Sequence, residues 1–208
     1  MDVHLNLESF RAKLDLARER KELLDFCRKH VLHGIPFVFK DRPDEYYDFK
    51  KIITNEFGDI SFHEVYITGS GKLGFSPYKG TMFDYDSDID VAIISSKLFD
   101  SIMNKISAYQ MQIRKNKRVV RESERSMYHE FLEYSAMGWI RPDKLPISFQ
   151  MDVLKQAWFR FFESISYNKS PVGNYKVTAG VFRTYEHLEA YIVSGLEGLR
   201  YKNIRDEN

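Results

Sequence analysis

A glycine-rich turn and a pair of aspartates are the residues of this sequence whose types and spacing could carry chemistry. Residues 68–74 read TGSGKLG, and DID follows at residues 88–90, eighteen positions after Ser70. Glycine has no side chain to block an approaching anion, and serine can donate its backbone N–H and its hydroxyl to a phosphate. We therefore predict phosphate binding by Gly69 and Ser70, with Lys72 adding a positive charge.

The two aspartates alternate within a strand-like segment. Residues 88–94 read DIDVAII, and side chains two positions apart on a strand project from the same face. Asp88 and Asp90 are thus predicted to bind one hard cation. Magnesium prefers oxygen ligands and usually keeps contact with substrate phosphates, so this pair beside a phosphate-binding turn favours metal-assisted phosphoryl or nucleotidyl transfer. The alternative is an ordinary acidic surface at the start of a strand.

Two other motifs compete for the same glycines. Residues 69–74 satisfy the G-x-G-x-x-G pattern of dinucleotide-binding folds, but the next residues, FSPYKG, break the helix that this pattern should open. A P-loop needs Ser or Thr after its Gly-Lys, whereas Leu73 follows Lys72 here. Both alternatives fit the sequence less well than a phosphate-binding turn paired with metal-binding aspartates.

The order of these residues resembles the DNA polymerase beta-like nucleotidyltransferase superfamily, especially its small bacterial members. The resemblance covers residues 65–94, in which a strand ends in Gly69-Ser70 and a spacer leads to Asp88-Ile89-Asp90 in an apolar strand. It implies a nucleoside triphosphate (NTP) held by Gly69 and Ser70, and two Mg²⁺ ions held by Asp88 and Asp90. The expected reaction transfers a nucleoside monophosphate to an acceptor hydroxyl and releases pyrophosphate. The long spacer predicts a shortened helix after Gly-Ser.

The resemblance also implies a third carboxylate on a later strand, and Asp152 is the candidate. Residues 147–153 read ISFQMDV, which alternates like a strand with the acid on its polar side. The same stretch also fits the start of a helix, with Ser148 as its cap. Both possibilities are compatible with the sequence.

The acceptor is predicted from a basic run at residues 112–125, QIRKNKRVVRESER. Cations near a phosphate backbone raise affinity without base contacts, so the run favours RNA, such as a tRNA end; a solvated surface is the alternative. Its candidate contacts are Arg114, Lys115, Lys117, Arg118 and Arg121. The resemblance equally allows a partner protein as acceptor and a role in toxin–antitoxin or phage-defence systems. An inactive nucleotide- or partner-binding module is the other function compatible with these residues.

The elements that must position these residues follow from periodicity and from turn residues. We expect helices over residues 7–33 and 41–58, strands over 64–68 and 88–94, a loop over 71–86 and a helix after Ser95. Two further helices are expected around residues 154–165 and 185–199. The predicted fold is α/β (α+β), a small mixed sheet of the nucleotidyltransferase type flanked by N- and C-terminal helices. Its segments are a helical part over 1–58, a core over 59–155 and a helical part over 156–208.

Composition limits the class of protein. The chain has 208 residues, 43% of them hydrophobic, which is enough to bury a substantial core. Lys and Arg total 31 against 30 Asp and Glu, so total charge indicates no general affinity for nucleic acid. The single cysteine, Cys27, and six histidines without metal-ligand spacing argue against a disulfide framework or a zinc site. With no apolar run of membrane-spanning length, we expect a cytoplasmic protein.

Overall fold

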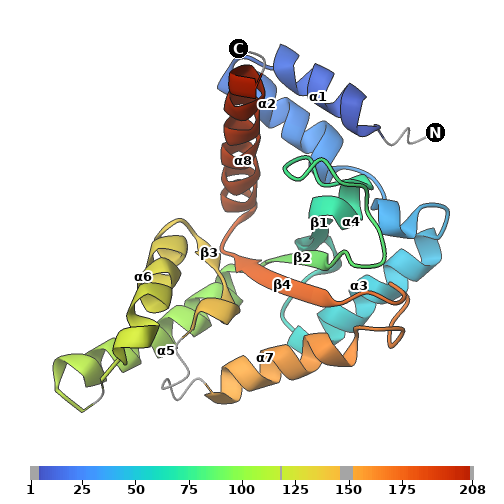
Figure 1. The fold of residues 1–208 in the computed structure, drawn as a ribbon. Helices are drawn as coiled ribbons and strands as arrows, with labels where there is room; N and C mark the ends of the chain where they lie inside the picture. Colours follow the sequence, from blue (N-terminus) through green and yellow to red (C-terminus); the bar gives the residue numbers. More distant parts are fainter. Residues whose placement is uncertain (1–4, 118, 146–151, 207–208) are drawn as a thin grey trace.

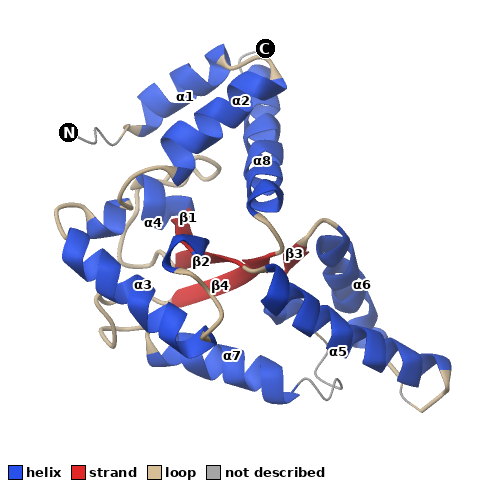
Figure 2. Cartoon of the chain, turned by 180° about the vertical axis from the view of Figure 1, so that it is seen from behind, coloured by secondary structure: helices blue, strands red, loops and turns tan. Residues whose placement is uncertain are grey.

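A four-stranded mixed sheet forms the centre of the protein. The computed structural model describes residues 5–117, 119–145 and 152–206, and within them eight α-helices surround the sheet (Figures 1 and 2). The strands are β1 (Val65–Thr68), β2 (Ile89–Ile94), β3 (Trp139–Ile140) and β4 (Val177–Phe182). Their order is β1-β2-β4-β3; β2 and β4 are parallel, whereas β1 and β3 run antiparallel to their neighbours. A mixed sheet flanked by N- and C-terminal helices is therefore confirmed.

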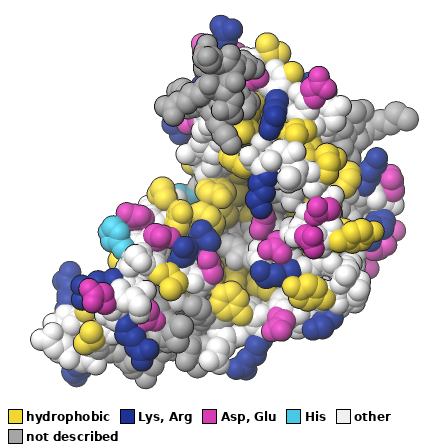
Figure 3. Space-filling model, in the orientation of Figure 1, with side chains coloured by type: hydrophobic (Ala, Val, Ile, Leu, Met, Phe, Trp, Pro, Cys, Tyr) yellow, Lys and Arg dark blue, Asp and Glu magenta, His cyan; other side chains and the backbone are white. Residues whose placement is uncertain are grey.

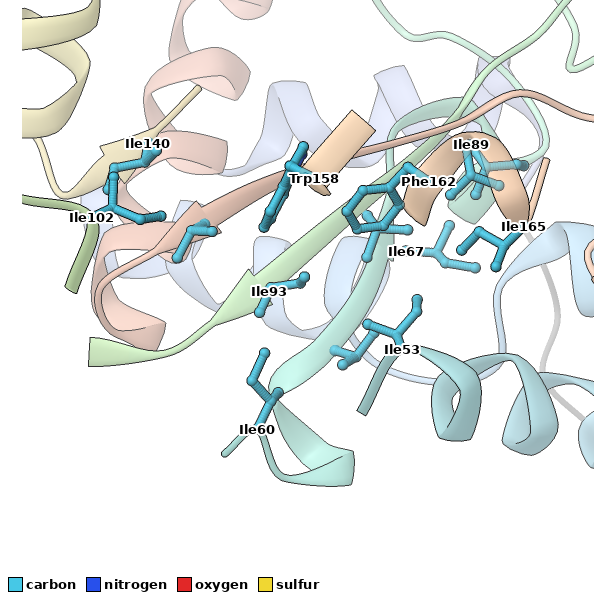
Figure 4. Packing of buried hydrophobic residues seen from close by; sticks show 14 of the residues in the cluster. Ile53, Ile60, Ile67, Ile89, Ile93, Ile102, Ile140, Trp158, Phe162 and Ile165 are labelled. Carbon is cyan, nitrogen blue, oxygen red and sulfur yellow. The ribbon is translucent and has the colours of Figure 1, made fainter. Parts of the chain in front are cut away.

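Each face of the sheet has its own hydrophobic core. The helices are α1 (Leu7–Leu16), α2 (Arg20–Phe26), α3 (Pro43–Phe57), α4 (Gly69–Leu73), α5 (Ser96–Arg114), α6 (Glu122–Ala136), α7 (Asp152–Ser164) and α8 (Tyr185–Asp206). Ile89 and Ile93 of β2 point into the core formed with α3, α5 and α7 (Figure 4). Ala92 and Ile94 pack instead with residues of α1, α2 and α8. Because side chains alternate along a strand, Asp90 shares the face of Ala92 and Ile94.

The N-terminal helical segment is interrupted, in contrast to the single helix predicted over residues 7–33. Helix α1 ends at Leu16, and a capping box between Glu19 and Glu22 starts α2. A π-helical turn over Cys27–Leu32 follows directly. Apolar periodicity continues through all three pieces, which explains why it predicts one helix. The predicted end of this segment near Gly34 is confirmed by its φ of 78°.

Local signals elsewhere predict the elements correctly. Helix α3 begins at Pro43 and ends before Gly58, whose φ is 62°. The Oγ of Ser95 accepts a hydrogen bond from the Leu98 N–H at 3.1 Å and so caps α5 as expected. The helix after the glycine turn is shortened to the five residues of α4.

Strand β4 is the main element that sequence periodicity missed. Residues 156–208 were expected to form helices only, yet Val177–Phe182 pair in parallel with all six residues of β2. Parallel pairing needs a long crossover connection, and here the connection runs through α5, α6, β3 and α7. The predicted boundary at residue 155 consequently falls between β2 and β4, which are adjacent strands of one sheet. The segment 156–208 therefore supplies part of the core.

Lys50 of α3 is buried among aromatic rings. Its Nζ lies 4.3 Å from the ring centroid of Phe62, 5.2 Å from that of Tyr46 and 5.8 Å from that of Tyr66. Burial lowers the pKa of Lys50 from 10.5 to about 8. The charged native form therefore costs about 3 kcal/mol, and the ring contacts offset part of this cost.

Lys50→Met is expected to raise the free energy of unfolding at pH 7 by about 1–2 kcal/mol. This is the part of the charging cost that the ring contacts do not offset. Between pH 8 and 10.5 the unfolded chain binds a proton that native Lys50 lacks, so wild-type stability should rise with pH relative to the variant. Urea unfolding from pH 7 to pH 10 measures both effects. Lys51→Met, at the exposed neighbouring position, is the control. A pH dependence identical in wild type and Lys50→Met would contradict the prediction.

Candidate active site

The glycine turn and the aspartates meet where β1 and β2 pair. Thr68 lies opposite Asp90 in the antiparallel register, and the Thr68 hydroxyl donates to the Asp90 carbonyl at 3.3 Å. Gly69 follows with a φ of 63°, and a Cβ there would lie 2.8 Å from Asp90 Oδ2. Only glycine satisfies both the backbone angle and the close approach. The structure thus brings the backbone of α4, whose first N–H groups lack intrahelical partners, against one of the predicted metal ligands.

The aspartates have neighbours on β4 and directly before it that the sequence did not reveal. Thr178 pairs with Asp90 in the parallel register, and its hydroxyl donates to Asp90 Oδ1 at 3.0 Å. The Nζ of Lys176 lies 3.5 Å from Oδ2 of Asp88, which directly precedes β2. The alternation in KVTAGVF is the signal that could have identified this strand.

Asp90 lies in a mixed electrostatic environment. Its side chain is open to solvent on one side, but surrounding protein desolvates it and raises its pKa, and the charge of Asp88 raises the pKa further. The hydrogen bond from Thr178 and the charges of Lys176 and Lys79 act in the opposite direction. A bound cation would relieve the repulsion between the two carboxylates.

The donor set fits a magnesium ion that is also bound by its substrate. Across residues 5–117, 119–145 and 152–206, no group of three or more His, Cys, Asp or Glu side chains is placed to hold a metal. The two carboxylates of Asp88, directly before β2, and Asp90, within it, nevertheless suffice for Mg²⁺, which commonly completes its shell with water and nucleotide phosphates. These residues would therefore hold the ion most tightly when a triphosphate is present.

Asp152 does not lie on the strand beside Asp90. It is the first residue of α7, so Asp152 itself is helical and does not belong to a strand; residues 147–151, Ser148 among them, lie outside the described residues. Helix α7 packs through Trp158 and Phe162 on the sheet face opposite to Asp90. The strand next to β2 is β4, where Thr178 occupies the position beside Asp90.

Lys72 has a structural role that differs from the predicted phosphate contact. Only 4% of the residue is exposed, and its ammonium donates to the carbonyl oxygens of His33 and Gly34, the latter at 2.7 Å. A helical residue two positions after Ser70 points to a different side of the short helix from Ser70. Lys72 therefore joins α4 to the end of the N-terminal helical segment.

The basic run forms the turn between α5 and α6, away from the aspartates (Figure 1). Arg114 is the last residue of α5, Lys115 and Lys117 lie in the turn, and Arg121 immediately precedes α6, whereas Arg118 is outside the described residues. Helix α5 starts at the far end of β2 from Asp90 and extends outward for 19 residues, about 28 Å. The predicted nucleic-acid contacts and the predicted metal ligands consequently form two separate features.

Comparisons with protein-family models, with curated proteins and with solved structures found no match to this chain. Within the described part of the chain, no helix is both long enough and apolar enough to cross a membrane. The site's own geometry therefore supplies the basis for a functional proposal.

Proposed function

We propose that this protein is a magnesium-dependent nucleotidyltransferase of the DNA polymerase beta-like type. It would transfer a nucleoside monophosphate from an NTP to an acceptor hydroxyl and release pyrophosphate. The observation that carries the proposal is the contact of Gly69 with Asp90, which joins a phosphate-binding turn to a carboxylate pair at one end of β2. Segments twenty residues apart in sequence form one site only because β1 and β2 pair in this register.

Each residue has a defined part in this reaction. The backbone N–H groups at Gly69 and Ser70 bind the triphosphate, and Lys176 and Lys79 add positive charge near Asp90. Magnesium, when held by Asp88 and Asp90, supplies charge neutralisation on the phosphates. The acceptor oxygen bonds to the α-phosphorus, the bond from that phosphorus to the oxygen bridging to the β-phosphate breaks, and the hydroxyl proton leaves to water.

A nucleotide-binding module without transfer activity is the second candidate function. It is favoured by Thr178, an uncharged residue beside Asp90 on a later strand, whereas the family resemblance implies a third carboxylate on a later strand. It is also favoured by Lys176, whose ammonium occupies part of the space next to Asp88 that a second cation would use. Turnover, rather than binding, separates the two functions.

The position of the basic turn favours RNA as the acceptor over a partner protein. A molecule that contacts both Asp90 and the turn containing Lys115 and Lys117 must span the rest of β2 as well as α5, which is itself about 28 Å long. A polyanion of that length gains affinity from counterion release at each cation that it meets. A small hydroxyl acceptor would reach the aspartates alone.

Calorimetric titration with each of the four NTPs tests the proposal. Because nucleotide phosphates complete the magnesium shell, at least one NTP is expected to bind much more tightly with Mg²⁺ than with a chelator present. Labelled nucleotide should then appear on an RNA or protein acceptor, with release of pyrophosphate. Magnesium-dependent binding without pyrophosphate release would support the binding module, and the absence of such binding would contradict both functions.

A further inference from the structure

An aromatic cluster made of Tyr134, Trp139, Phe182 and Tyr191 lies on the sheet face that carries Asp90. The Trp139 and Phe182 rings are stacked at 5.6 Å with an interplanar angle of 2°, and Tyr191 lies 4.4 Å from Trp139 between ring centroids. Tyr134 contacts Trp139 edge-on at 4.8 Å. These residues come from α6, β3, β4 and α8. Hydrophobic side chains gather on the surface between α6 and α8 (Figure 3).

Glycine at position 180 allows Trp139 to lie over β4. A Cβ on Gly180 would come within 2.5 Å of Trp139 Nε1, so the indole covers the strand at this point. Gly180 follows Thr178 by two residues, which places it on the same face and about 7 Å further along the strand. Trp139 of the aromatic cluster therefore lies over the position next to Thr178 on this face of β4, and Thr178 is hydrogen-bonded to Asp90.

Tyr191 of α8 is the exposed member of the aromatic cluster, with 49% of the residue accessible to solvent. Burial raises its pKa, and the charge of Asp90 raises it further, which is consistent with their proximity. One helical turn along α8, a Cβ on Gly195 would lie 2.0 Å from the Tyr78 hydroxyl oxygen, so Tyr78 of the loop after α4 rests against α8. Tyr78 thus contacts α8 one helical turn from Tyr191, on the helix that packs against the sheet face carrying Asp90.

The two sides of Asp90 have different chemistry. On the β1 side lies the phosphate-binding turn at Gly69, and on the β4 side lies the aromatic cluster with the Arg141 guanidinium 5.5 Å from the rings of Tyr134 and Trp139. A nucleotide whose phosphates bind at the turn extends its nucleoside away from that turn. A planar base then meets an aromatic surface, on which bases of any sequence can stack.

We propose that Tyr191, supported by Trp139, stacks on the base of the bound nucleoside triphosphate and so provides the base-binding part of the site. The proposal rests on the proposed function, because it needs the triphosphate to bind at Gly69 and Ser70. The group that Tyr191 binds is the nucleobase. Inorganic tripolyphosphate has the three phosphates of the NTP without a base, and it is therefore the matched control compound. Tyr191 is a binding residue here and takes no part in the bond changes at phosphorus.

Fluorescence of Trp139 provides a direct readout. Trp158, the other tryptophan, is buried in the core on the opposite face, so Trp158→Phe leaves Trp139 as the reporter. Magnesium with an NTP is expected to quench this fluorescence, whereas magnesium with tripolyphosphate is expected to bind without quenching. Quenching of equal size by both compounds would overturn the proposal.

Affinity measurements on Tyr191 variants complete the test. Tyr191→Ala should weaken NTP binding about ten-fold and leave tripolyphosphate binding unchanged, whereas Tyr191→Phe should retain wild-type affinity for both because the ring remains. Tyr47→Ala is the control, since Tyr47 is similarly exposed (53%) on α3 across the sheet. Unchanged NTP affinity in Tyr191→Ala would overturn the inference alone. Failure of wild type to bind either compound with Mg²⁺ would overturn the proposed function as well.

Discussion

Replacing Asp90 by asparagine is expected to lower nucleotidyl transfer by about 10³-fold. Asparagine has nearly the same shape and keeps an oxygen that can accept the hydrogen bond from Thr178, so the fold should persist. In the proposed function, the substitution removes the negative charge that would hold magnesium against the phosphates. Groups that stabilise transition-state charge typically contribute effects of this size.

The rate of labelled nucleotide incorporation, measured with thermal unfolding as a check on folding, tests this expectation. Asp86→Asn is the matched control, because Asp86 is an exposed aspartate of the same acidic segment that precedes β2. Its activity should remain near that of wild type. Asp90→Asn with wild-type transfer and unchanged magnesium dependence would show that the carboxylate pair does not carry the reaction.

Arg28→Met is expected to lower the free energy of unfolding by about 2–3 kcal/mol. Arg28 binds Glu189 of α8 through two hydrogen bonds, of 2.5 Å from Nε and 3.0 Å from Nη2. The Glu189 side chain is only 5% exposed, whereas that of Arg28 is 50% exposed. Removal of Arg28 leaves a buried carboxylate without its cation, which usually costs more than the pair itself contributes.

A double substitution separates that cost from the loss of packing. Arg28→Met combined with Glu189→Leu removes both charges and should recover most of the lost stability, as urea unfolding will measure. Lys29→Met, at the exposed neighbouring position, should change stability little. Equal losses in the single and double variants would show that the ion pair does not hold the π-helical turn to α8. This contact also matters for the site, because α8 carries Tyr191.

Much of the local structure could be predicted because its causes lie within a few residues. Pro43 and Gly58 delimit α3, and Ser95 caps α5, through contacts with their own backbone neighbours. Errors occurred where one local signal overrides another and where distant residues decide. The capping box at Glu19 interrupts a continuous apolar stripe, and β4 forms only because β2 offers a parallel partner more than eighty residues earlier.

The residues of the candidate site also fall into those whose positions the sequence predicts and those whose positions it does not. The glycine turn after a strand and the position of Asp90 on an alternating strand could be predicted from the sequence, since both are local patterns, and their phosphate- and metal-binding roles stay predictions. The assignment of Lys72 depended on the direction of its side chain from a short helix, and that of Asp152 depended on a strand at a position where the structure has a helix. Lys72 is directed to the carbonyl oxygens of His33 and Gly34, and Asp152 begins a helix.

By itself, the sequence determined the chemistry available at β1 and β2, namely a glycine turn after β1 and two carboxylates at the start of β2. The tertiary structure alone decided what surrounds them. The parallel pairing of β4 places Thr178 and Lys176 beside the aspartates, and the packing of α8 brings Tyr191 to the same face. Residue type and spacing specify a local conformation, whereas the neighbours of a side chain depend on pairings between segments far apart in the chain.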